Sequence, residues 1–247
     1  MNTFSRLGPS FVVLILLGAG CAPAGTPGSP ASPTARGGNC DNPYYPLREG
    51  HQITYKTQTA GHAGTMTMKV TGVSASGATV TNDFGGVVST QQVRCVGGTL
   101  EATGTLDTSG TGVAVTGRSE TRSSSGTFIP QDLSAGKIWD SAAQTAVTMT
   151  LPAAAARVNG GSTTLEVVTD TTTHNEALAE ESITVPAGTY RAIKVKSTIT
   201  ATSQGGLPGM DATHTTVTNE WFVRDVGLVK TVNEDGTSTM EATSVTP

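Results

Sequence analysis

The stretch Thr65-Met-Thr-Met-Lys-Val-Thr-Gly-Val73 decides the fold class, because apolar and polar side chains alternate along most of it. Successive side chains of an extended chain point to opposite faces, so the apolar residues at 66, 68 and 70 share one face. A period of two predicts a β-strand with one buried and one exposed face.

Runs with strand character continue on both sides of this stretch, and turn signals separate them. Gly61-His-Ala-Gly64 is predicted to be the turn before it. Only Ala153–Arg157 looks helical. The predicted strands are 52–59, 65–73, 78–82, 87–96, 99–106, 112–122, 138–140, 145–151, 163–174, 181–185, 190–202, 213–224, 227–233 and 238–245. Consecutive hairpins of this kind predict antiparallel sheets, as a β-sandwich or an open β-barrel.

One hairpin is expected to centre the core of the second half. Pro186-Ala-Gly-Thr189 is its predicted tight turn. Its apolar face is expected to come from Val185, Ile193, Val195 and Ile199, with Trp221 and Val223 on a following strand.

Composition agrees with sheet, since β-branched residues favour strands. The chain has 42 threonines between Cys21 and Pro247. Residues 40–247 are expected to form one antiparallel β domain. Two related lobes, 40–125 and 126–247, are the alternative, because Pro46–Tyr55 and Pro130–Trp139 each combine a proline, a glycine and a final aromatic residue.

The first twenty residues have the features of a secretory signal. Arg6 is their one charge, Phe11–Leu17 is an unbroken apolar run, and Gly18-Ala-Gly20 precedes Cys21. A basic start, a short apolar core and small residues before a cleavage site are typical of export signals. The segment Leu17–Cys21 resembles the bacterial lipobox, with glycine at position 18 where leucine is commoner. The resemblance implies cleavage before Cys21 and lipidation of that cysteine, which would anchor the protein to a membrane.

Residues 21–39 are predicted to be a flexible linker after the lipidated cysteine. The segment is rich in Pro, Gly, Ser, Thr and Ala, and its only charge is Arg36. Such a composition cannot bury enough apolar surface to offset the entropy of ordering. Ala22 stands where an aspartate signals inner-membrane retention in some bacteria, so the expected location is the outer membrane or the cell surface.

Cys40 and Cys95 are predicted to form a disulfide. They are the two cysteines left once Cys21 is assigned to lipid, and an exported chain meets oxidising conditions. Two thiolate metal ligands are the alternative, but no Cys or His lies near them at finger-like spacing.

Charge and motifs exclude several classes of function. Removal of residues 1–20 takes away Arg6 and no acid, which leaves 14 basic against 19 acidic residues. No basic patch is present, so nucleic acid is not an expected partner. The sequence has no Gly-x-Ser-x-Gly elbow and no phosphate-binding loop, so we expect no catalytic residues.

The four histidines raise the alternative of a metal site. His62 shares parity with Met66 and Met68 if the strand reaches back through the turn. Imidazole with thioethers suits copper, chiefly Cu(I). Methionines are more often core residues than ligands, so no cofactor is the primary expectation. The remaining candidates are His51, His174 beside Asn175 and Glu176, and His214, which alternates with Thr216, Thr218 and Glu220 on a face predicted to be exposed.

Two segments of the chain resemble a known family. Glu181–Val195, with its Val-Pro-Ala-Gly-Thr-Tyr, and Glu220–Lys230 resemble uncharacterised envelope lipoproteins with TapB-like β domains. Tyr45–Gly50 resembles the start of those domains. The resemblance implies an antiparallel β fold in the envelope, and it carries no catalytic residues to transfer.

The sequence therefore predicts a lipid-anchored envelope protein whose non-enzymatic β domain binds another envelope component, with an envelope protein as the expected partner. One alternative is a copper-binding redox protein, for which a superoxide dismutase-like activity would be the enzymatic reading. The other is a carrier of lipid or another hydrophobic ligand inside a β cavity.

Overall fold

The computed structural model describes residues 42–96, 99–107, 116–150, 161–205 and 212–247. None of these residues forms a helix long and apolar enough to cross a membrane. The strands are β1 (Gln52–Thr59), β2 (His62–Ser74), β3 (Gly77–Asp83), β4 (Val88–Val96), β5 (Thr99–Asp107), β6 (Thr116–Gly126), β7 (Ile138–Thr150), β8 (Thr164–Val185), β9 (Gly188–Gly205), β10 (Ala212–Val223), β11 (Gly227–Asn233) and β12 (Ser238–Thr246).

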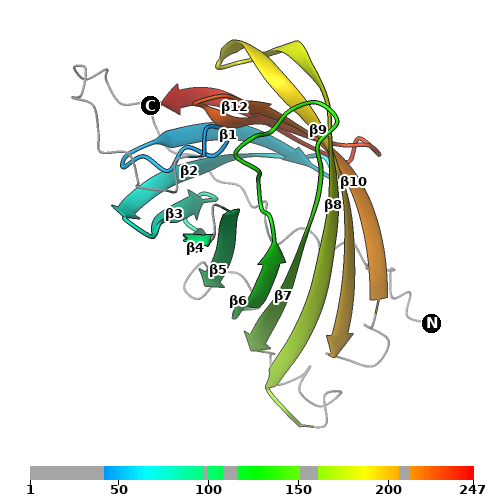
Figure 1. Ribbon diagram of the computed structural model, residues 1–247. Helices are drawn as coiled ribbons and strands as arrows, with labels where there is room; N and C mark the ends of the chain where they lie inside the picture. Colours follow the sequence, from blue (N-terminus) through cyan, green and yellow to red (C-terminus); the bar gives the residue numbers. More distant parts are fainter. Residues whose placement is uncertain (1–41, 97–98, 108–115, 151–160, 206–211) are drawn as a thin grey trace.

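The twelve strands form one closed barrel in which each strand pairs with its neighbours in sequence. All the pairings are antiparallel, and β1 closes the ring by pairing with both β2 and β12. Figure 1 shows that β7 to β10 are long and strongly curved, whereas β3 to β5 are short. The predicted antiparallel all-β fold is confirmed. Both halves of the sequence contribute consecutive strands to the same ring.

Several predicted strand boundaries are wrong. Segments 138–140 and 145–151 are one strand, β7, and segments 163–174 and 181–185 belong to β8. A β-bulge between Ala177 and Glu180 lets β8 change direction without ending. The turn before β2 is Ala60-Gly61, both with positive φ, so β2 already starts at His62. Ala153–Arg157 lies outside the described residues.

Buried apolar side chains form two clusters. The first contains Val70, Val80 and Ile193, and the second contains Ile53 and Tyr55. The ends of β9 and β10 are buried on both faces. Their residues in the first cluster are Ile193, Val195 and Phe222, and those in the second are Ala192, Trp221 and Val223.

The predicted single apolar face of the β8–β9 hairpin is therefore wrong in two residues. Val185 pairs with Gly188, which lies on the opposite face from Ile193, so Val185 joins the second cluster. Ile199 lies on the face of Ile193 but is only partly buried and belongs to neither cluster.

Side chains complete the closure where strand pairing is short. β11 and β12 pair only from Lys230 to Val232 on the β11 side. Beyond that point, the Tyr55 hydroxyl donates to the backbone oxygen of Leu228 at 2.8 Å. The His51 ring lies 3.0 Å from the backbone oxygen of Val226 through Nε2. These contacts tie the start of the described chain to its last strands.

Candidate functional site

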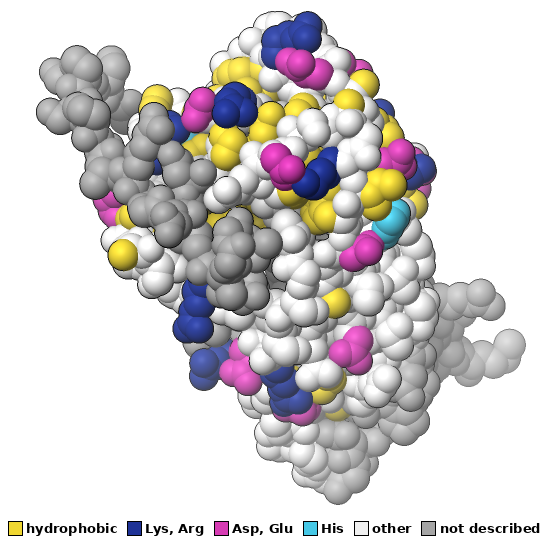
Figure 2. Space-filling model, viewed as in Figure 1, with side chains coloured by type: hydrophobic (Ala, Val, Ile, Leu, Met, Phe, Trp, Pro, Cys, Tyr) yellow, Lys and Arg dark blue, Asp and Glu magenta, His cyan; other side chains and the backbone are white. Residues whose placement is uncertain are grey.

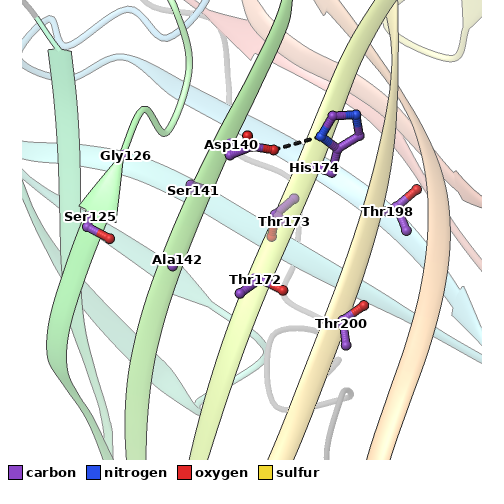
Figure 3. A pocket seen from close by; sticks show the side chains of 10 residues that line it. All are labelled: Ser125, Gly126, Asp140, Ser141, Ala142, Thr172, Thr173, His174, Thr198 and Thr200. Carbon is purple, nitrogen blue, oxygen red and sulfur yellow. Dashed lines mark hydrogen bonds and ion pairs between the residues drawn. The ribbon is translucent and has the colours of Figure 1, made fainter.

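An open depression of about 390 Å³ lies across β6, β7, β8 and β9. Hydroxyl groups and small side chains dominate its lining, and one carboxylate and one imidazole are the ionisable groups (Figure 3). The lining residues are Ser125, Gly126, Asp140, Ser141, Ala142, Thr172, Thr173, His174, Thr198 and Thr200. No lysine, arginine or aromatic residue is among them.

Three of these residues form a row across neighbouring strands. His174 is the cross-strand partner of Asp140 on β7 and of Thr198 on β9. Its Nδ1 atom lies 2.7 Å from Oδ1 of Asp140 (Figure 3). Direct partners share a face of the sheet, so the row lies on the outer face. The contact between Asp140 and Nδ1 fixes the orientation of the imidazole ring and therefore the direction of its other nitrogen, Nε2.

The row lacks the further contacts of a catalytic triad. Asp140 is the sole hydrogen-bond partner of the His174 ring among the described residues. Both side chains of the pair are more than half exposed, so water screens their attraction. The arrangement therefore presents hydrogen-bonding groups to solvent.

Apolar side chains border the depression. A smaller cavity of about 90 Å³ shares Ser125, Gly126, Ser141, Ala142 and Thr173 with it, and Phe128 lines that smaller cavity. Ile138 precedes Asp140 by two residues on β7 and therefore lies on the same outer face. Ile138 is 58% exposed and Phe128 is 43% exposed. We call these two residues the apolar rim.

A segment near the start of the described chain supports the rim. The Asn42 side chain donates to the backbone oxygen of Ile129 at 2.8 Å. The rings of Tyr45 and Phe128 meet edge to face with centroids 5.2 Å apart. Phe128 is thus held in place although much of its ring is exposed.

Few charges interrupt the surface over part of the barrel. On the face shown in Figure 2, a broad area at the lower right carries mostly uncharged polar side chains and backbone. Threonines from β9 and β10 contribute to such a surface, since Thr200 pairs with Thr215 at 3.2 Å and Thr202 with Thr213 at 3.0 Å.

A second polar group lies inside the barrel. Thr218 and Glu220 of β10 were expected on an exposed face, but Thr218 is 7% exposed and its partner Ser197 is buried. The Ser197 hydroxyl lies 3.0 Å from Oε2 of Glu220, and burial raises the pKa of that carboxyl. The expectation of exposure is wrong for Thr218, because the interior of the barrel carries polar rows beside its apolar clusters. His214, on the same face of β10, is exposed as expected.

The four histidines do not converge. His51 precedes β1 and His62 pairs with Thr59 at its far end, so roughly 25 Å of strand separates them. His174 faces outward, whereas His214 pairs with Ala201 on the inward-facing row. Within the described residues, no three His, Cys, Asp or Glu side chains are grouped as metal ligands would be.

His62, Met66 and Met68 do share one face of β2. His62 is exposed, and Met66 and Met68 pack in the apolar clusters. Packing in the core accounts for both methionines without a metal. Copper binding through His62 stays a prediction.

The cysteine predictions concern parts that are not described. Cys21 and Cys40 lie outside the described residues. Cys95 is on β4 opposite Leu100, but its side chain is not described. Lipidation of Cys21 and the Cys40–Cys95 disulfide therefore stay predictions.

Sequence reasoning missed Asp140 and Glu220 as members of polar sites. Asp140 is 34 residues from His174, and only strand pairing brings them together. A signal existed for Glu220, since it alternates with Phe222, a large apolar residue at the end of the same row.

The fold and these sites define an all-β barrel protein with a hydrogen-bonding depression on its outer face. The chain belongs to the DUF3108-like family, whose model matches residues 48–245.

Two solved structures are similar to the chain. One is a protein from Bacteroides fragilis NCTC 9343 described as exported with a YmcC-like fold, at 15% identity, covering 83% of this chain and 99% of that one, with a TM-score of 0.45. The other is a protein from Parabacteroides distasonis ATCC 8503 described as a lipoprotein, at 19% identity, covering 82% and 98%, with a TM-score of 0.44. No curated protein matches the sequence significantly.

Proposed function

We propose that this protein is a lipid-anchored component of the cell envelope whose barrel is a non-enzymatic module that binds another envelope protein. The apolar run before Cys21 supports the anchor. The outer membrane or the cell surface is the proposed location, since Ala22 follows the lipidated cysteine. We also propose that the barrel is related to the β domains of TapB-like lipoproteins.

The observation that carries the proposal is the position of the apolar rim. Only three large apolar side chains of the described residues are strongly exposed, namely Val88, Phe128 and Ile138. Phe128 lines the smaller cavity next to the depression, and Ile138 stands two residues from Asp140 on β7. Protein interfaces combine a few apolar anchors with surrounding hydrogen-bonding groups, which is the combination found here.

The chemistry of the depression favours a protein over other envelope components. It has no lysine or arginine to contact phosphate groups of lipids or nucleic acids. It has no aromatic wall of its own. The hydroxyls of Thr172, Thr198 and Thr200 can donate to and accept from backbone groups of a partner.

Barrel closure directs binding to a face of the sheet. A partner strand can add only to an unpaired edge. β1 and β12, the first and last strands, pair with each other and leave no terminal edge. The depression and its rim are the docking surface that we propose.

Site-specific photocrosslinking in intact cells tests the proposal. A photoreactive residue at position 138 or 172 should capture one defined partner, and the same residue at position 88 should not. Val88 is the matched control, because it is 45% exposed and apolar but lies on β4. Ile138→Asp should abolish capture from position 172, and Val88→Asp should leave it unchanged. Equal capture from positions 88 and 138 would contradict the proposed surface.

The anchor has its own test. Cys21→Ser should leave the protein uncut or in the soluble fraction, because the acyl chains that hold it to the membrane would be missing. Unchanged membrane association and gel mobility would exclude lipidation at Cys21. No observation in the described residues favours the copper-protein or lipid-carrier alternatives over a binding module.

A further inference from the structure

A row of polar side chains crosses the inside of the barrel from β7 to β10. Trp139, Asn175, Ser197 and Thr218 are cross-strand partners in succession. All four are buried. Glu220 follows Thr218 by two residues on the same face of β10, and Thr231 of β11 is its direct partner.

The Ser197 hydroxyl cannot donate to both of the acceptors beside it. The Ser197 hydroxyl lies 2.8 Å from Oδ1 of Asn175 and 3.0 Å from Oε2 of Glu220. A serine hydroxyl donates one hydrogen, so it can satisfy only one of these two acceptors. The Asn175 amide is held in this orientation because its Nδ2 donates to the backbone oxygen of Trp139.

Two hydroxyl oxygens beside Glu220 also lack partners. The Oγ1 atoms of Thr218 and Thr231 are buried and make no hydrogen bond. Thr218 is more than nine-tenths buried, and a buried polar atom without a partner costs free energy. Direct cross-strand partners have Cβ atoms about 5 Å apart, so these hydroxyls lie near Glu220 and Ser197.

Glu220 has no cationic partner among the described residues. Its neighbours Lys194, Lys196 and Lys230 lie on the outer face, where Lys194 and Lys230 stack on Trp221 and Lys196 pairs with Glu234. A buried carboxylate needs a compensating positive charge or a proton. Burial accordingly raises the pKa of Glu220.

We propose that Glu220, Ser197, Asn175, Thr218 and Thr231 form an oxygen-lined site for a hard cation, Na⁺ or Ca²⁺, inside the barrel. Carboxylate, amide and hydroxyl oxygens are the ligands that such cations take, and the five side chains offer six oxygen atoms. A cation at this site can be coordinated by Oδ1 of Asn175 and Oε2 of Glu220, the two acceptors near the Ser197 hydroxyl. It can also be coordinated by the hydroxyl oxygens of Thr218 and Thr231, which have no other partner. The single carboxylate makes the affinity modest, because ligand charge tunes cation affinity.

The site is independent of the outer-face docking surface. It joins β8, β9, β10 and β11 from within, between Phe222 of the first apolar cluster and Met240 of the second. A bound cation therefore stabilises the folded barrel, since a ligand that binds only the native state raises the unfolding temperature.

Thermal unfolding of the full-length protein in detergent, combined with calorimetric titration, tests the site. NaCl, CaCl₂ and choline chloride are compared at equal ionic strength and pH 7.5. Na⁺ or Ca²⁺ should raise the melting temperature above that in choline, and the cation that does so should give binding heat. Glu220→Gln should weaken that binding at least tenfold. Glu166→Gln, on the outer face of β8, is the matched control and should bind as the wild type does.

Two outcomes would overturn the proposal. One is a wild-type protein whose melting temperature and titration heat are the same in all three salts, which would mean that Glu220 simply holds a proton. The other is a Glu220→Gln variant that keeps the cation effect. If Glu220→Gln does not fold, Thr218→Val and Thr231→Val, each removing one ligand oxygen, should weaken binding several-fold, and unchanged binding in both would count against the site.

Discussion

The Nε2 atom of His51 lies 3.0 Å from the backbone oxygen of Val226, a residue 175 positions later in the chain. His51 is fully buried, and its other ring nitrogen has no partner. Nε2 must carry the hydrogen of this bond, because a backbone oxygen can only accept, so the neutral ring fits the site.

The stability of the barrel should depend on pH through His51. Burial lowers the pKa of His51, and Arg48 lowers it further. The unfolded chain, with a histidine pKa of about 6.5, then binds the proton more readily than the folded chain. The contribution of His51 is present above about pH 6.5 and is lost as the pH falls through the lowered pKa of the folded state.

Urea unfolding of wild type and His51→Gln between pH 4.5 and 8 measures this contribution. The difference in unfolding free energy between the two proteins should shrink as the pH falls. Glu220 makes the unfolding free energy change with pH in the opposite direction, because its pKa is raised in the folded state. Both proteins contain Glu220, so this effect cancels in the difference between them. His62→Gln, at an exposed position, should keep the wild-type profile, and a difference for His51→Gln that is constant with pH would refute the prediction.

Truncation of Ile193 should destabilise the barrel strongly. Ile193 belongs to the first apolar cluster and is buried. Ile193→Ala should lower the free energy of unfolding by about 2–5 kcal/mol, because it removes buried methyl groups and leaves a cavity. Ile138→Ala, at the exposed apolar rim, should change it by no more than about 0.5 kcal/mol. Similar losses for both would mean that Ile193 is not in the core.

Gly126 should tolerate alanine less well than other glycines with positive φ. Its φ is +79°, and an added Cβ would collide with the backbone oxygen of Asp140. Gly136 has a φ of +82° with nothing near its missing Cβ. Gly136→Ala should cost about 1–2 kcal/mol from the left-handed backbone alone. Gly126→Ala should cost clearly more and should weaken partner capture, since it distorts the wall of the depression; equal costs in urea unfolding would contradict this account.

The predicted disulfide is tested by counting thiols. The denatured, unreduced Cys21→Ser protein should have no free thiol, because Cys40 and Cys95 are its remaining cysteines. Replacing Cys95 with serine should then destabilise the protein by about 4 kcal/mol in the chain-entropy model. Detection of two free thiols would show that the disulfide does not form.

The sequence alone predicts which residues share a face of a strand, but not whether that face is buried or exposed in the fold. Alternation at 66, 68 and 70 predicts the buried face of β2, and Met66 and Val70 are indeed buried. The same rule applied to His214, Thr216, Thr218 and Glu220 predicts an exposed face; His214 is exposed, but Thr218 is buried. Alternation separates the two faces of a strand, but it does not say what covers each face.

By itself, the sequence determined that this chain is an antiparallel all-β protein, because period-two alternation and turn residues act over a few positions. Only the tertiary structure decided that the strands close into one barrel. Closure depends on pairing β1 with β12 and on bulges such as that between Ala177 and Glu180, which no local pattern marks. The same closure places Asp140 beside His174 and Glu220 beside Ser197, since the register between strands sets which residues meet.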